Sequence, residues 1–150
     1  MNGIRKAERR DSSRIAEISV FTKRMNYRSI FHNDKVSFGE LQVLPLAQSY
    51  LADGHGLDGI WVYEEDFVKG FLHVEKQELV ELYVDSFFQS SGIGGKLMEF
   101  AVGKFDVNCL WVLKKNERAV SFYKKHGFEL TGEQRLEEGT TEYSVEMMRR

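Results

Sequence analysis

Residues 81–97 combine an apolar run, a polar loop and a glycine-rich helix start. The sequence ELYVDSFFQSSGIGGKL places Gln89, Gly92 and Gly94 where a predicted strand is followed by an amphipathic helix. The first N–H groups of a helix have no partner within the helix, and the helix macrodipole adds positive charge there. Glycine lacks a Cβ atom, so an anion can approach the backbone closely. The segment therefore predicts a cradle for an oxyanion or a pyrophosphate group.

Two common phosphate loops do not match this segment. Ser90 stands where the first glycine of a Walker A loop belongs, and Leu97 follows Lys96 where that loop has Ser or Thr. The dinucleotide fingerprint G-x-G-x-x-G also fails, because the sixth position counted from Gly92 is Leu97. The pattern that remains is Q-x-x-G-x-G, which begins at Gln89.

A second motif follows after one predicted helix and one predicted strand. Residues 116–128 read NERAVSFYKKHGF. Together the two motifs resemble the GNAT superfamily of acetyl-CoA-dependent N-acetyltransferases, which has a Q-x-x-G-x-G pyrophosphate loop and a later N-x-x-A-x-x-F-Y-x-x-x-G-F motif. The resemblance extends from about Trp61 to the C-terminus and is thin over residues 8–58. Ser90 departs from the glycine that many members carry after the glutamine.

The resemblance implies a fold. We expect a single α/β (α+β) domain over residues 1–150, with a mixed, mostly antiparallel central sheet and helices on both faces. In the family the fourth and fifth strands splay apart, and coenzyme A lies in the V-shaped gap. Its pantetheine arm bonds to the exposed edge of the fourth strand, like an added strand.

The resemblance also implies cofactor-binding residues. Backbone groups of Leu82 and Val84 would bind the pantetheine arm, and the loop N–H groups would bind the pyrophosphate. Asn116 resembles an asparagine that contacts pantetheine or fixes the backbone. The expected cofactor-binding set is Leu82, Tyr83, Val84, Gln89, Ser91, Gly92, Ile93, Gly94, Gly95, Asn116, Ala119 and Tyr123.

Acyl transfer from a thioester to an amine needs a neutral amine, donors for the oxyanion and a proton for the leaving thiolate. By resemblance, Tyr123 is the general acid, and a phenol is a suitable partner for a thiolate. Glu81 is the expected general base, with Glu78 and a water chain as alternatives. The oxyanion donor would be the backbone N–H of Tyr83 or Val84. Proximity of the two substrates can supply much of the rate, so no single base need be essential.

The expected function is transfer of the acetyl group of acetyl-CoA to a primary amine by direct attack in a ternary complex. The alternative is a non-catalytic acyl-CoA-binding sensor or regulatory module. The acceptor is a small-molecule amine or a peptide, and its wall would come from residues 22–52 and the predicted hairpin at 133–141. These segments carry aromatic and charged side chains, namely Tyr27, Phe31, Phe38, Tyr50, Arg135, Glu137 and Glu138.

The elements that position these residues can be predicted from hydrophobic periodicity and turn chemistry. A helix capped by Asp11 or Ser12 is expected to have an apolar stripe of Ile15 and Ile18, extended by Val20 and Phe21. Two or three short helices fit residues 22–52, with Pro45 at a helix start. Helices are also expected at 93–105 and 116–126, the second ended by Gly127. Strands are expected at 4–7, 60–64, 67–74, 78–84, 108–113, 128–131 and 141–148.

The composition excludes several classes of protein. The 150 residues are 42% hydrophobic, with a formal net charge of −2 and a single cysteine. This balance argues against a nucleic-acid partner, and no apolar run predicts a membrane span, so a cytoplasmic protein is expected. The histidines have no ligand spacing, so no metal is expected, and Cys109 is expected to be a small buried residue. The family resemblance leaves a homodimer open.

Overall fold

The computed structural model describes residues 3–31, 42–52, 54–137 and 140–150, without the side chains of residues 26–31. The elements run β1 (Gly3–Lys6), η1 (Arg9–Asp11), α1 (Ser12–Phe31), α2 (Val43–Leu51), β2 (Ile60–Glu65), β3 (Phe67–Glu75), β4 (Glu78–Val84), η3 (Ser86–Phe88), α3 (Ile93–Phe105), β5 (Cys109–Leu113), α4 (Glu117–Lys125), β6 (Phe128–Leu136) and β7 (Tyr143–Arg149). The strands form one sheet in the order β1-β2-β3-β4-β5-β7-β6. Neighbouring strands are antiparallel, except that β4 and β5 are parallel.

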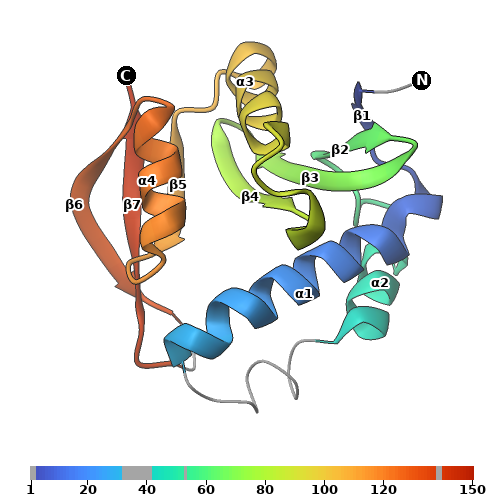
Figure 1. The fold of residues 1–150 in the computed structure, drawn as a ribbon, viewed down its shortest axis with the longest axis horizontal. Coiled ribbons are helices and arrows are strands. Elements are labelled where there is room, and N and C mark those ends of the chain that lie inside the picture. Colours follow the sequence, from blue (N-terminus) through green and yellow to red (C-terminus); the bar gives the residue numbers. More distant parts are fainter. Residues whose placement is uncertain (1–2, 32–41, 53, 138–139) are drawn as a thin grey trace.

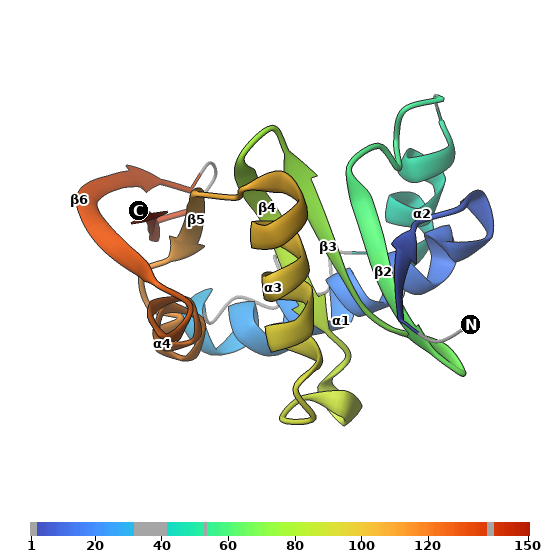
Figure 2. The same cartoon turned by 90° about the horizontal axis from the view of Figure 1, so that it is seen from above.

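Helices pack on both faces of the sheet (Figures 1 and 2). Strand alternation divides the apolar residues between two clusters. Ile15 and Ile18 of α1 pack in one cluster with Val62 and Phe71, whereas Leu97 of α3 belongs to the other. All five side chains are at most 2% exposed, so each helix is held by close packing of its apolar stripe. The predicted α/β fold class and the helices on both faces are confirmed.

The pairing of β4 with β5 is short. The two strands are matched only at Glu78 with Cys109 and at Leu79 with Leu110, and then separate. The register between β3 and β4 shifts at this point, because His73 pairs with Glu81 while the next residue of β3 pairs with Leu79. A β-bulge bends and twists a strand locally, which turns the rest of β4 away from β5. The predicted splay of the fourth and fifth strands is present.

Some sequence predictions about elements are wrong. Residues 22–31 do not start a short helix but continue α1 to Phe31, and Phe21 is 48% exposed instead of belonging to the apolar stripe. Strand β6 continues beyond Thr131 to Leu136, because it pairs with β7 along an otherwise exposed edge.

Cys109, predicted to be buried, is only partly buried. None of the described helices is long and apolar enough to cross a membrane.

Candidate active site

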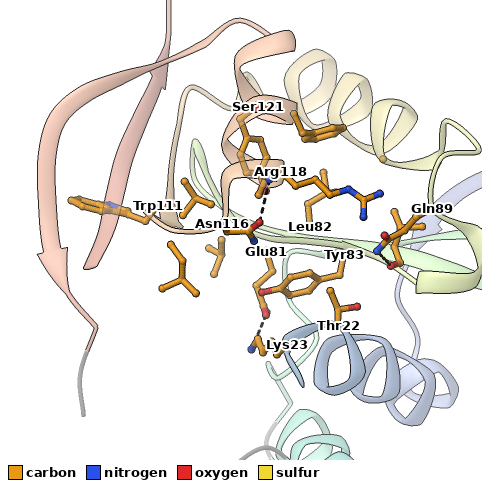
Figure 3. Close-up of a pocket in the computed structure, with 18 of the residues that line it drawn as sticks. Thr22, Lys23, Glu81, Leu82, Tyr83, Gln89, Trp111, Asn116, Arg118 and Ser121 are labelled. Carbon is orange, nitrogen blue, oxygen red and sulfur yellow. Dashed lines mark hydrogen bonds and ion pairs between the residues drawn. The ribbon is translucent and has the colours of Figure 1, made fainter. Parts of the chain in front are cut away.

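A cavity of about 830 Å³ opens where β4 and β5 separate (Figure 3). Its lining comes from α1, β4, the loop before α3 and the first turn of α3, β5, α4, β6 and β7. We call the part lined by Gln89, Gly92, Gly94, Asn116 and Arg118 the glycine end. We call the part lined by Lys23, Glu81, Trp111, Arg135 and Glu137 the charged end.

The hydrogen-bond pattern of β4 determines which backbone groups face the cavity. The N–H of Asp85 donates to the carbonyl of Lys69 at 2.8 Å, so these two residues form a hydrogen-bonded pair of the β3–β4 ladder. Such pairs alternate in an antiparallel ladder with pairs whose N–H and C=O groups point outward. By this alternation the backbone groups of Leu82 and Val84 point away from β3 and toward the gap. These are the two residues expected to bind a pantetheine arm.

The same alternation separates the two predicted oxyanion donors. Tyr83 lies opposite Phe71 in the hydrogen-bonded class, so its N–H is directed to β3 and not to the gap. Val84 faces the gap, and its carbonyl accepts a hydrogen bond from the Gln89 side chain at 3.1 Å. Of the two candidates, only the N–H of Val84 is oriented toward a ligand in the cavity.

The glycine loop is held in shape by residues on both sides of it. Asp85 accepts hydrogen bonds from the N–H of Phe87 at 2.9 Å and from Arg14 at 2.7 Å, which anchors the loop where it leaves β4. Gly92 is the N-cap of α3 and has φ of 88°, a left-handed conformation that L side chains rarely adopt. An added Cβ at Gly94 would lie 3.4 Å from the ring of Phe122, so this glycine lets α3 and α4 approach closely. The helix start therefore presents unpaired N–H groups toward the cavity.

Asn116 has a structural role at the start of α4. Its Oδ1 accepts a hydrogen bond from the N–H of Ala119 at 3.2 Å, which caps the helix (Figure 3). The amide NH₂ group has no partner within the described chain, and the residue lines the cavity. One side chain can therefore fix the helix end and still donate to a ligand. Arg118, on the same helix, extends toward Gln89.

Tyr123 lies on the α4 wall of the cavity. Its ring packs against Phe122 and Phe128, with centroids 5.4 and 6.2 Å away, and its hydroxyl has no hydrogen-bond partner among the described residues. Burial raises the pKa of Tyr123 to about 12. The phenol therefore stays protonated through the physiological range and can act as a hydrogen-bond donor.

Glu81 lies on the face of β4 that is packed by α1. Its Oε2 is 3.2 Å from Nζ of Lys23, and its Oε1 is 3.9 Å from Nδ1 of His73. Burial would raise the pKa of this carboxyl, but its interactions with His73 and Lys23 outweigh burial and hold the pKa below its ordinary value. Glu81 is therefore ionised at neutral pH.

The rest of the charged end comes from the C-terminal strands. The guanidinium carbon of Arg135 lies 4.3 Å from the ring centroid of Trp111, a cation–π contact between β6 and β5. Glu137 accepts a hydrogen bond from the hydroxyl of the buried Ser144. Arg135 and Glu137 were predicted from the sequence as site residues, whereas Lys23, Trp111 and Arg118 were not. Lone basic and aromatic residues in helices and strands carry no pattern that distinguishes them from ordinary surface or core residues.

Most of the predicted site residues meet in the cavity. The lining includes Glu81, Leu82, Tyr83, Val84, Gln89, Gly92, Gly94, Gly95, Asn116, Ala119 and Tyr123. Ser91 and Ile93 do not line it, because the Ser91 hydroxyl bonds to the carbonyl of Phe88 and the Ile93 side chain belongs to the core. Glu78, the alternative base, also lines the cavity.

Only some of the residues predicted to form an acceptor wall line the cavity. Thr22, Lys23, Arg135 and Glu137 line the cavity, whereas Tyr50 packs against the core cluster beneath α1. The side chains of Tyr27 and Phe31, and all of Phe38 and Glu138, lie outside the described residues. Within the described part of the chain, no three His, Cys, Asp or Glu side chains are grouped so as to hold a metal ion.

Comparison with known proteins identifies the class. The model of the GNAT acetyltransferase domain matches residues 56–130, which include the gap, the glycine loop and α4. The chain belongs to the GNAT acetyltransferase family.

Particular relatives can be named within this family. The chain is 33% identical over 81 residues to the peptidyl-lysine N-acetyltransferase YjaB of Escherichia coli K12, an alignment that covers 53% of this chain and 55% of that protein. YjaB of Salmonella typhimurium is 31% identical over 81 residues, covering 53% and 56%. The alignment spans about half the length of these curated relatives.

Solved structures extend the likeness of fold to the whole chain. The solution structure of apo YjaB from Escherichia coli matches with a TM-score of 0.79 and 22% identity, over 99% of this chain and 97% of that one. The PaiA N-acetyltransferase from Thermoplasma acidophilum, in complex with coenzyme A, matches with a TM-score of 0.67 and 21% identity over 97% and 98%. At this level of identity the matches concern the fold.

Proposed function

We propose that the protein is an N-acetyltransferase that transfers the acetyl group of acetyl-CoA to a primary amine by direct attack in a ternary complex. The observation that carries this proposal is the gap between β4 and β5. The two strands pair at only two positions, and the cavity beyond them has Tyr123 on one wall and Glu81 on the other. Two ligands that enter from opposite ends of the cavity would meet between these two side chains.

The glycine end suits the diphosphate and pantetheine parts of coenzyme A. The N–H groups at the start of α3 and the positive end of its dipole favour an anion. The outward backbone groups of Leu82 and Val84 suit the amides of pantetheine, which would pair with β4 like a strand. We assign Arg118 to a phosphate group, because it lines the glycine end and has no ion-pair partner in the described part of the chain.

The chemical roles follow from the protonation states. The ionised Glu81 accepts a proton from the acceptor ammonium, directly or through water, which leaves the amine free to attack the thioester carbonyl carbon. The N–H of Val84 donates to the carbonyl oxygen as negative charge develops on it. The carbon–nitrogen bond forms as the carbon–sulfur bond breaks, and Tyr123 donates its proton to the departing sulfur. The nitrogen loses a proton as it becomes an amide, and this proton restores the phenol through water, so the products are the amide and the free thiol of coenzyme A.

Cys109 does not suit a covalent acetyl-enzyme route. It does not line the cavity. Burial and the nearby carboxylates of Glu78 and Glu146 raise the pKa of its thiol, so little thiolate forms at neutral pH. Direct attack needs no such nucleophile. The likeness to YjaB supports the lysine side chain of a peptide as the acceptor to test first.

The experiment is incubation with acetyl-CoA and a panel of amines that includes lysine peptides, followed by measurement of free thiol. Thiol release that depends on the amine supports the transferase. Tight binding of acetyl-CoA with no thiol release from any amine would favour the alternative, a non-catalytic acyl-CoA sensor.

A further inference from the structure

An ammonium group already occupies the charged end of the cavity, and it belongs to the chain itself. Lys23 reaches from α1 to Glu81, with Nζ 3.2 Å from Oε2, and its side chain is 22% exposed. The same Nζ lies 5.9 Å from the ring centroid of Tyr83, within cation–π range. Figure 3 shows Lys23, Glu81 and Tyr83 gathered on one side of β4.

These contacts are the ones that an alkylammonium ligand would need. A carboxylate compensates the charge, an aromatic face adds a cation–π contact, and partial burial strengthens both. Three carboxylates line the cavity, those of Glu78, Glu81 and Glu137. Among these three, Glu81 alone forms an ion pair with a lysine or arginine within the described part of the chain.

We propose that Lys23 occupies the subsite of the acceptor's ammonium group and that an acceptor binds there by displacing Lys23 from Glu81. The chemical class of ligand is an unbranched primary alkylammonium, such as the end of a lysine side chain. This inference rests on the proposed function, because it assigns the charged end of the proposed active site to the acceptor.

The exchange replaces one ammonium group beside Glu81 with another, so the charges at this end of the cavity stay balanced. The carboxylate of Glu81 remains paired throughout, so no buried charge is left unpaired as the acceptor enters. The four-carbon stem of Lys23 is flexible, and an ammonium is strongly hydrated, so the displaced group can move toward solvent. An amine that is uncharged at neutral pH has no charge to exchange and should not displace Lys23.

The variant that tests this inference is Lys23→Met, which keeps the apolar stem and removes the ammonium. The probes are n-butylamine and a lysine peptide blocked at its N-terminus, and the readouts are the Kd of n-butylamine by calorimetry and the KM of the peptide. We expect both constants to fall by about three- to tenfold, because the ligand no longer competes with an internal ion pair. The KM of acetyl-CoA should stay within about twofold of the unmodified protein.

Two control variants separate displacement from a structural effect. Lys23→Arg keeps a cation beside Glu81 and should keep the original Kd and KM. Lys115→Met removes another lysine–glutamate ion pair, to Glu142 at 2.7 Å, whose two members do not line the cavity, and should change neither constant. Thermal unfolding of each variant shows whether it is folded, and Lys23→Gln is the substitute where Lys23→Met is not.

The outcomes distinguish this inference from the proposed function. Unchanged or weaker n-butylamine binding in Lys23→Met would overturn the subsite, whatever the enzyme does with acetyl-CoA. Tighter binding in Lys23→Met, together with no thiol release from any amine, would support the subsite and refute the transferase.

Discussion

The two ends of the cavity are built in different ways. The glycine end relies on backbone groups, with a left-handed Gly92 and a helix cap at Asn116, and its residues come from two motifs close together in the sequence. The charged end relies on contacts between side chains, such as the Lys23–Glu81 ion pair and the Arg135–Trp111 cation–π contact, whose members come from different elements well separated in the chain. The glycine end should therefore respond to changes of backbone conformation. The charged end should respond to single side-chain charges.

The largest expected effect is that of Gly92→Glu at the glycine end. The φ of 88° is unfavourable for any L side chain, by about 1–2 kcal/mol, and the new carboxylate would compete with the ligand's anion for the start of α3. We expect acetyl-CoA affinity to fall by about a hundredfold or more in calorimetry. The matched control is Gly103→Glu on the exposed side of the same helix, where a Cβ meets nothing and φ is not positive. Equal affinities of the two variants would show that the cofactor binds elsewhere.

Tyr123→Phe tests the proposed role of the phenol that lies between the two ends of the cavity. It removes the hydroxyl and keeps the ring packing, so we expect kcat to fall by about 10²-fold with little change in the KM of acetyl-CoA. Because the pKa of Tyr123 is raised to about 12, its deprotonation should not limit the unmodified enzyme below that pH. The control is Tyr143→Phe, an exposed tyrosine of β7 outside the cavity. An unchanged kcat in Tyr123→Phe would remove the phenol from the mechanism.

Glu81→Gln tests the charged end, and we expect it to lower kcat by about tenfold or more. Since interactions with His73 and Lys23 hold the pKa of Glu81 below its ordinary value, the carboxylate is lost only as pH falls through that lowered value. In the pH profile of the unmodified enzyme, the loss due to Glu81 should therefore begin only at a pH below the ordinary range of a glutamate.

Two further glutamates make the Glu81 experiment decisive. Glu75→Gln, outside the cavity, should leave kcat unchanged. Glu78→Gln should also leave it nearly unchanged, and a large loss there with none in Glu81→Gln would make Glu78 the base.

The smallest expected effects come from one arginine at each end. Arg118→Gln should raise the KM of acetyl-CoA by about two- to fivefold, since an exposed guanidinium gives a phosphate modest stabilisation. Arg135→Gln should change the KM of the acceptor by a similar factor and leave that of acetyl-CoA unchanged. Initial-rate kinetics with each substrate varied in turn measure both constants. An effect of either variant on the opposite substrate would show that the two ends are not separate.

Several predicted elements and the glycine end follow from chemistry that is local in the chain. Neighbouring residues alone were enough to predict the change from strand to helix periodicity at Gly92. The same is true of the asparagine that precedes the helix containing Ala119. The continuation of α1 through residues 22–31 was missed because its hydrophobic pattern is weak there. The length of β6 was missed because an edge strand that is largely exposed has no clear alternation, and pairing with β7 decides where it ends.

The sequence by itself therefore determined the family, the order of the elements and the backbone chemistry of the glycine end, because these depend on residues that are near one another in the chain. Only the tertiary structure decided that β4 and β5 separate after two residue pairs and that Lys23 meets Glu81 in the opening. It also decided that Arg135 stacks on Trp111 and that the N–H of Tyr83 is turned away from the gap. The physical reason is that ion pairs, ring contacts and strand register depend on which elements pack together, and single residues carry no periodic signal of such contacts.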